Sequence, residues 1–273
     1  MPIQDKQNDY LNLLNDLKID CTNCSGLCCV ALYCSKVDGF PENKEASIPC
    51  QHLQSNFQCD MHQDLSRKNM KGCMTYECFG AGQKVTQMYG LDHTWQTHPQ
   101  QRQHIFETFL VVFQLHQMLW YLIQASTLDA CAKFKQEIAR LIEEATTLTT
   151  KKPYTLLSYD IDHYRNQVNK ILKCIIEQIS KSSNNQNNMY LGKNFKGKNL
   201  DHQDFSMSLL IAANLENCSL RGTNFLSADL RDANFKNTDL RESLFLTQMQ
   251  INSAKGNHNT LLPSYLTQPC TWL

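Results

Sequence analysis

The sequence predicts an α+β protein with three parts: a loop-rich, metal-bound N-terminal region, an α-helical middle, and a C-terminal repeat that turns a corner every five residues. Nine of the thirteen cysteines lie between Cys21 and Cys78. Residues 100–180 carry apolar side chains at helical spacing. From Phe195 onward, a large apolar residue recurs at every fifth position. We assign the three parts to residues 1–90, 91–182 and 190–273.

The N-terminal cysteines have the spacing of metal ligands. In the densest run, Cys21-x-x-Cys24-x-x-x-Cys28-Cys29, thiolates two residues apart can hold one ion. His62 follows Cys59 by three residues, so one helical turn would place both on one face. Thiolate-rich sites favour zinc, copper(I) or iron, and one of these is the expected cofactor. The expected ligands are Cys21, Cys24, Cys28, Cys29, Cys50, Cys59, His62, Cys73 and Cys78.

Over about residues 21–80, the order of these cysteines resembles the YkgJ-type cysteine-cluster family, bacterial proteins proposed to chelate zinc or iron. The resemblance runs from Cys21 through Cys50, Leu53 and Cys59 to Cys73. It implies a metal-chelating region. His62 stands where tyrosine is common in that family, and YECFGAG around Cys78 is an addition. Cys34 lies outside the matched pattern.

The middle part should consist of helices packed in a core. Residues 108–128 carry no formal charge, but they include Gln114, His116, Gln117 and Gln124, which are costly to bury in lipid. We therefore expect a buried helix rather than a membrane span. Asp129 is the expected N-cap of the next helix, Pro153 separates the second from the third, and residues 180–188 read as a polar linker.

The C-terminal part is an internal repeat with a period of five. Small residues occupy the position two before each large one from Ser208 onward, so one large and one small side chain per repeat should point inward. Lys193, Lys198 and Gln203 break the small-residue pattern, which predicts a first coil that is irregular or capped by the helical part. The large residues are Phe195, Leu200, Phe205, Leu210, Leu215, Leu220, Phe225, Leu230, Phe235, Leu240 and Phe245.

The segment AANLENCSLRGTNFLSADLRDANFKNTDL resembles the pentapeptide-repeat family, whose repeat is A-(D/N)-L-x-x. The resemblance covers about residues 190–273 and implies a right-handed quadrilateral β-helix with four pentapeptides per coil and a C-terminal cap. It says little about function, because this scaffold serves many roles.

Three functions fit these features. The first is a cytosolic protein that holds zinc, iron or copper in its cysteine cluster and uses the repeat as a platform for a protein partner. The second is a redox metalloenzyme with a thiolate-rich, multinuclear or open site. The third, a DNA mimic that protects gyrase, is disfavoured because residues 190–256 hold eight basic and seven acidic residues.

Composition, the N-terminal residues and the remaining cysteines and histidines bear on the partners, the localisation and the number of metal sites. A net charge of zero argues against a nucleic-acid partner, and we expect no membrane partner. The first residues lack the pattern of a signal peptide, which favours a reducing cytoplasm where cysteines bind metals rather than form disulfides. Cys218 and Cys174 read as core residues. The histidines at 93, 98, 104 and 116 read as structural, with a second, imidazole-bound site as the alternative.

Overall fold

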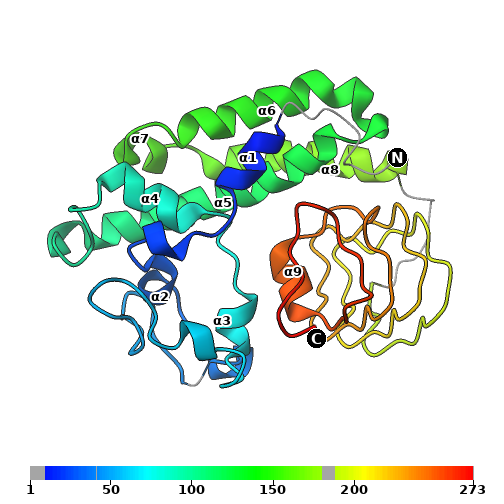
Figure 1. Cartoon of the computed structure of the whole chain (residues 1–273). Helices are drawn as coiled ribbons and strands as arrows, with labels where there is room; N and C mark the ends of the chain where they lie inside the picture. The colour runs from blue at the N-terminus through cyan, green and yellow to red at the C-terminus, as the bar shows by residue number, and fades with distance from the viewer. Residues whose placement is uncertain (1–9, 41, 180–187, 273) are drawn as a thin grey trace. The chain divides into compact units, whose positions relative to one another are not determined.

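The computed structural model describes residues 10–40, 42–179 and 188–272 (Figure 1). The chain divides into two compact units. We call Tyr10–Ile123 together with Gln136–Asn169 the cysteine unit. The coil unit consists of the described residues of Gln124–Lys135 and Lys170–Leu273. The nine clustered cysteines all belong to the cysteine unit. The predicted linker at 180–188 lies almost wholly outside the described residues.

The N-terminal part of the cysteine unit consists of short helices joined by long loops. Glycines in the left-handed conformation precede two of the helices, Gly26 with φ 69° and Gly80 with φ 71°. The α-helices are α1 (Leu11–Asp16), α2 (Leu27–Ala31), α3 (Lys71–Thr75) and α4 (Ala81–Tyr89), and the 3₁₀ helices are η2 (Cys21–Asn23), η3 (Lys36–Asp38) and η4 (His62–Asp64).

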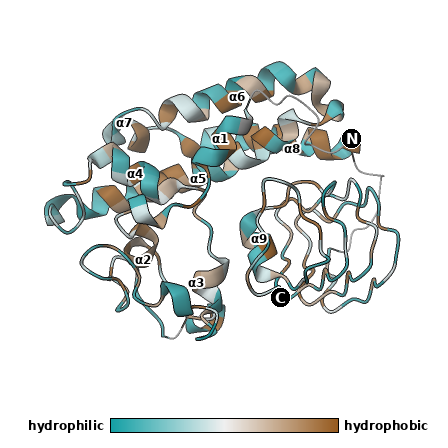
Figure 2. Ribbon diagram, viewed as in Figure 1, coloured by the Kyte–Doolittle hydropathy of each residue, from teal (hydrophilic) through white to brown (hydrophobic). Residues whose placement is uncertain are grey.

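Longer helices follow, as the apolar spacing predicts. In α6 and α8, Ile138, Leu141, Tyr164 and Val168 are buried, and hydrophobic (brown) and hydrophilic (teal) residues alternate along the ribbons of both helices in Figure 2. The Tyr164 hydroxyl donates to the Leu141 carbonyl at 2.8 Å and joins α8 to α6. The bounds are η5 (Pro99–Gln101), α5 (Arg102–Ser126), η6 (Asp129–Phe134), α6 (Lys135–Leu148), α7 (Pro153–Leu157) and α8 (Ile161–Ile179).

The sequence predictions of an N-cap at Asp129 and of a buried helix over residues 108–128 can be compared with this region. Asp129 is not an N-cap: Leu128 caps a 3₁₀ helix that begins at Asp129, and α6 begins only at Lys135. The segment Pro99–Ser126 is long and apolar enough to cross a membrane, but 67% of its most apolar window is buried inside the protein. That burial is compatible with the core helix of a soluble protein.

Residues 189–246, the coil stack, turn back on themselves every 20 residues. Parallel bridges join residues 20 apart, such as Asn194 with Asn214 and Asn214 with Asn234. Four pentapeptides therefore complete one coil, as predicted. The bridges are isolated, and the described residues contain no strand or continuous sheet. The β component of the predicted fold class is thus present as bridges alone.

The core of the coil stack follows the period of five without exception. All eleven large residues predicted to point inward are buried, from Phe195 to Phe245. The small residues are buried with them, and the hydroxyls among them bond to the neighbouring coil: Thr223 donates to the Leu200 carbonyl at 2.8 Å, and Thr238 to that of Leu215 at 2.9 Å. Cys218 is a core residue of this kind, and its thiol donates to the Phe195 carbonyl.

The two ends of the stack differ. In the first coil Lys193 and Lys198 are exposed, and the Lys193 ammonium lies 5.0 Å from the ring centre of Tyr190. The bridges of this coil nevertheless keep the 20-residue spacing, so the irregularity that the sequence predicted is not found in its backbone. At the C-terminal end, α9 (Gln248–Ser253) begins with a capping box formed by Thr247 and Gln250. The Gln250 amide also donates to the carbonyls of Phe225 and Ala228, both at 2.9 Å.

Candidate metal centre

The loop that carries the middle cysteines has no hydrophobic core of its own. No described residue between Leu32 and Asn69 is buried, and the regular structure there is limited to two 3₁₀ helices and two isolated bridges. A chain of this length must gain enough free energy to offset the entropy of ordering its backbone. Burial of apolar surface within the segment does not supply that free energy, so other bonds must hold it.

One lysine supplies some of these bonds. The Lys44 ammonium donates to the carbonyls of Val30, Leu32, Glu45 and Ile48, and the Lys44 backbone forms an antiparallel bridge with Cys34. The hydrogen bond with Cys28, and then the positive charge of Lys44, lower the pKa of Cys29, whereas at Cys34 burial raises the pKa and the Lys44 charge only opposes that increase. Lys44 therefore places a cation beside cysteines that would be thiolates in a metal site.

Two turns of the same design place sulfur atoms at the starts of helices. Cys24-Ser25-Gly26 leads into α2, and Cys78-Phe79-Gly80 leads into α4, each through a left-handed glycine. Backbone hydrogen bonds from Leu27 and Gly26 act on the Cys24 sulfur, and bonds from Gly82 and Gly80 act on the Cys78 sulfur. Both sets oppose the increase in pKa that burial causes. Hydrogen bonds from amides to sulfur are also how proteins tune metal-bound thiolates.

Gly82 in α4 leaves the space into which these sulfurs project. A Cβ atom at this position would lie 2.6 Å from the Sγ of Cys24 and 3.9 Å from the Sγ of Cys78. A Cβ atom would therefore crowd the Cys24 sulfur, while its contact with the Cys78 sulfur would be an ordinary one. The two turns thus converge on one side of α4.

We expect Gly82→Ala to displace the Cys24 thiol and to destabilise the cysteine unit by about 1–3 kcal/mol, as overpacking does. Gln87→Ala on the exposed side of the same helix is the matched control, because alanine favours the helix without touching a cysteine. Chemical denaturation of both variants tests this expectation. Equal stability of the two would show that the sulfurs do not need the space at Gly82.

The nine clustered thiols lie close enough to affect one another's charge. The Sγ atoms of Cys28 and Cys29 are 3.9 Å apart, and the Cys28 thiol donates to Cys29, which raises the pKa of Cys28 and lowers that of Cys29. Burial, and then repulsion from four other thiols, raises the pKa of Cys73 to about 12. Burial raises the pKa of Cys78 to about 12 as well. A bound cation would reverse such shifts, because it stabilises thiolates.

Each of the eight predicted cysteine ligands interacts electrostatically with at least one other clustered thiol, whereas His62 does not take part. The His62 ring is exposed, with no side-chain hydrogen bond among the described residues, although its backbone N–H does donate to Cys59 at 3.3 Å. Cys34, which lies outside the sequence pattern, interacts with Cys29 and Cys50 and joins the cluster. In the described part of the chain, no three Cys, His, Asp or Glu side chains are arranged as ready-made metal ligands.

Sequence reasoning missed three further residues of this region. Lys44 and Gly82 act through contacts with distant parts of the chain, which spacing does not reveal. Glu77 is buried beside Cys78, accepts from the Phe79 amide at 2.9 Å, and has a pKa raised by burial to about 7. The sequence Cys-x-Gly, which precedes both α2 and α4, is the signal that could have revealed the paired turns.

The histidines between the cluster and the helices have hydrogen-bond partners within the protein. His93 bonds with Gln101 at 2.8 Å, His98 with Thr97 at 2.9 Å and His104 with the Tyr89 hydroxyl at 2.8 Å. His116 donates from Nδ1 to the Phe79 carbonyl at 2.7 Å. These bonds support the structural role rather than a second, imidazole-bound site.

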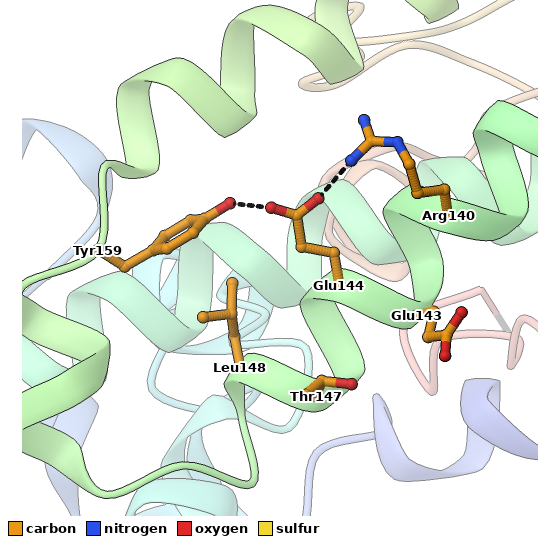
Figure 3. Close-up of a pocket in the computed structure, with 6 residues that line it drawn as sticks. All are labelled: Arg140, Glu143, Glu144, Thr147, Leu148 and Tyr159. Carbon is orange, nitrogen blue, oxygen red and sulfur yellow. Dashed lines mark hydrogen bonds and ion pairs between the residues drawn. The ribbon is translucent and has the colours of Figure 1, made fainter.

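A surface pocket of about 430 Å³ beside α6 contains charged residues that bind one another (Figure 3). The Glu144 carboxylate accepts from the Tyr159 hydroxyl and, at 2.7 Å, from Arg140. Arg140 is also bidentate to Glu137. The Arg140, Glu144 and Tyr159 side chains of this pocket therefore bind one another.

Known proteins resemble this chain at two levels: one family matches the repeat, and one relative matches almost the whole chain. The family described as Pentapeptide repeats matches residues 208–245 in eight copies. The uncharacterized protein YybG of Bacillus subtilis (strain 168) is 39% identical over 269 residues, which is 96% of each chain. No solved structure matches. The resemblance of the N-terminal region to the YkgJ-type family stays a prediction. The chain carries pentapeptide repeats and belongs to the same family as YybG.

Proposed function

We propose that this protein binds zinc, iron or copper through its cysteine cluster and acts in the cytoplasm. The observation that carries the proposal is the segment between residues 32 and 69, which lacks buried residues yet brings its cysteines beside those of α2 and α3. Metal–thiolate bonds would supply the free energy that a hydrophobic core does not. The fit is further supported by the amide hydrogen bonds to Cys24 and Cys78 and by the space that Gly82 leaves.

Chelation of the purified full chain tests this proposal. Elemental analysis should find stoichiometric metal, and a strong chelator should increase hydrogen exchange in residues 21–80. The coil stack serves as the internal control, because its hydrogen bonds and core do not involve these cysteines. Equal protection of residues 21–80 before and after chelation, or a chain without metal, would refute the proposal.

The coil stack is proposed as a binding platform for a protein partner, in the form of a right-handed β-helix. Four apolar side chains, Met189, Leu191, Met207 and Leu209, are exposed on its first turns, and Met189 bridges to Leu209. Such exposed apolar side chains are more typical of interaction surfaces than of solvated ones.

Local ion pairs argue against imitation of DNA by this stack. Arg221 pairs with Glu242, Arg241 with Asp239 and Lys196 with Glu216, at 2.7–3.0 Å. The acidic side chains are thereby neutralised by neighbours, whereas a duplex presents unpaired negative charge at regular intervals.

A further inference from the structure

We propose that the open N-terminal end of the coil stack is a latent interface for a second copy of this chain, and that Lys193 and Lys198 hold the two copies apart. The inference does not depend on metal binding, because it uses residues of the coil stack alone. It concerns the first coil, residues 189–208, which no other described coil precedes.

The backbone edge of the first coil is open. In the second coil, the Asn214 amide donates to the Lys193 carbonyl of the coil before it, at 2.9 Å. The equivalent amides one coil earlier or one side further on, those of Asn194 and Asn199, have no hydrogen-bond partner among the described residues. An unpaired edge of this kind is a template for pairing with another chain.

The end of the core beneath this edge is aromatic. The rings of Tyr190, Phe195 and Phe205 pack edge-on against one another, with ring centres 5.3–5.8 Å apart. All three rings are buried, although no described coil covers them from the N-terminal side. Side chains of the first coil itself must therefore cover them.

The small inward position of the repeat shows which side chains do so. In later coils the side chain at this position points back at the coil before it, as when the Cys218 thiol donates to the Phe195 carbonyl. Lys198 holds the same position one coil before Cys218, and Lys193 holds it one repeat earlier. Since no described coil lies before them, these two side chains extend toward the open end.

The two lysines lie over the aromatic end of the core. The Lys193 ammonium is 5.0 Å from the ring centre of Tyr190 and 5.1 Å from that of Phe195, and the Lys198 ammonium is 5.9 Å from that of Phe195. Both lysines are nevertheless exposed. Their aliphatic stems can thus cover the rings while their charges stay in water.

The other charged side chains of the first coil are turned toward the second coil. Lys196 pairs with Glu216 at 3.0 Å. The carboxylates of Asp201 and Asp204 accept hydrogen bonds from side chains of the second coil, at 2.6 and 2.9 Å. The charges presented at the open end are therefore the two positive charges of Lys193 and Lys198.

A second copy would meet this end head to head, because the C-terminal end of the stack is already covered by the tail of the chain. There the Phe235 amide donates to the Lys255 carbonyl at 2.7 Å, and the Leu240 amide to that of Leu261 at 2.8 Å. Two open ends related by a two-fold axis would bring four lysines together, and like charges oppose that contact. Without the lysines, two aromatic ends and two open edges could pair.

Restoration of the small residues in the full chain tests the proposal. The double variant Lys193→Ala with Lys198→Thr introduces the residues that stand two coils later, Ala233 and Thr238. We expect analytical ultracentrifugation at low ionic strength and micromolar concentration to give this variant twice the mass of the unsubstituted chain.

The matched control is Lys173→Ala with Lys236→Ala, which removes two exposed lysines that lie outside the first coil. It should keep the mass of the unsubstituted chain. In the associated variant, hydrogen exchange at Asn194 and Asn199 should slow. A folded double variant that keeps the original mass, or that associates without this protection, would overturn the proposal.

Reversal of the charge gives a second test, which does not depend on the fold of the small-residue variant. Lys193→Glu with Lys198→Glu should by itself keep the mass of the unsubstituted chain, because its two ends again carry like charges. Mixed with the unsubstituted chain, it should form a one-to-one complex that weakens as salt is added. Absence of this complex at low ionic strength would refute the interface.

Discussion

Replacement of Phe225 by Asp should unfold the coil stack. The Phe225 ring is fully buried, stacked at 5.9 Å on Phe205 and edge-on at 6.0 Å to Phe235. Loss of a buried phenylalanine costs about 3–5 kcal/mol, and an unpaired buried carboxylate adds several more. The sum is comparable to the whole stability of a typical domain, about 5–15 kcal/mol.

Thermal unfolding followed by circular dichroism should show the loss of the stack's transition. Met207→Asp is the matched control, since it introduces the same charge into the same coil stack at an exposed site with a positive φ that aspartate tolerates. We expect the control to melt as the unsubstituted chain does. Unchanged melting of Phe225→Asp would mean that the inward register of the repeat is wrong.

The second large effect should appear on acidification, through His116. Burial lowers the pKa of His116 to about 4, against an ordinary value of 6.5. Because the folded chain holds the neutral ring, the unfolded chain takes up a proton first as the pH falls. The stability contributed by the neutral ring is complete above pH 6.5 and is lost as the pH falls from 6.5 toward 4. The loss amounts to about 3 kcal/mol at about 1.4 kcal/mol per pKa unit.

His116→Asn is the matched comparison, because an amide can donate to the Phe79 carbonyl in place of Nδ1 but does not titrate. Urea denaturation between pH 7 and pH 4, at equal metal content, should show a smaller loss of stability in the variant than in the unsubstituted chain. Parallel pH profiles for the two proteins would contradict a buried, neutral His116.

The sequence predicted the coil stack more fully than it predicted the metal site. In a repeat of five residues, the large side chain of every repeat points into the core. Counting alone therefore placed Phe195 and Phe245, which are ten repeats apart, in the core. The predicted N-cap at Asp129 was wrong, because a 3₁₀ helix begins at that residue and α6 begins only at Lys135, and local spacing does not distinguish the two kinds of helix start.

The cysteine cluster shows where spacing stops being informative. Cys21 to Cys29 share one short segment, so their convergence follows from the sequence. The inclusion of Cys34 depends on its bridge with Lys44, and the pairing of Cys24 with Cys78 depends on α4. Such long-range closures are determined by tertiary structure. His62 was predicted to be a metal ligand because it follows Cys59 by three residues in the sequence, but its side chain is exposed at the surface.

The 20-residue coil also limits how the length of this protein can change during evolution. An insertion of one to four residues in the stack moves every later large side chain out of the core. An insertion of five keeps the core, yet it turns everything that follows, including α9, by one side of the coil relative to Asn194 and the rest of the first coil. Only a gain or loss of 20 residues restores both the core and the orientation of the faces. Stacks of this family should therefore differ from one another by whole coils wherever both ends of the stack have a fixed partner.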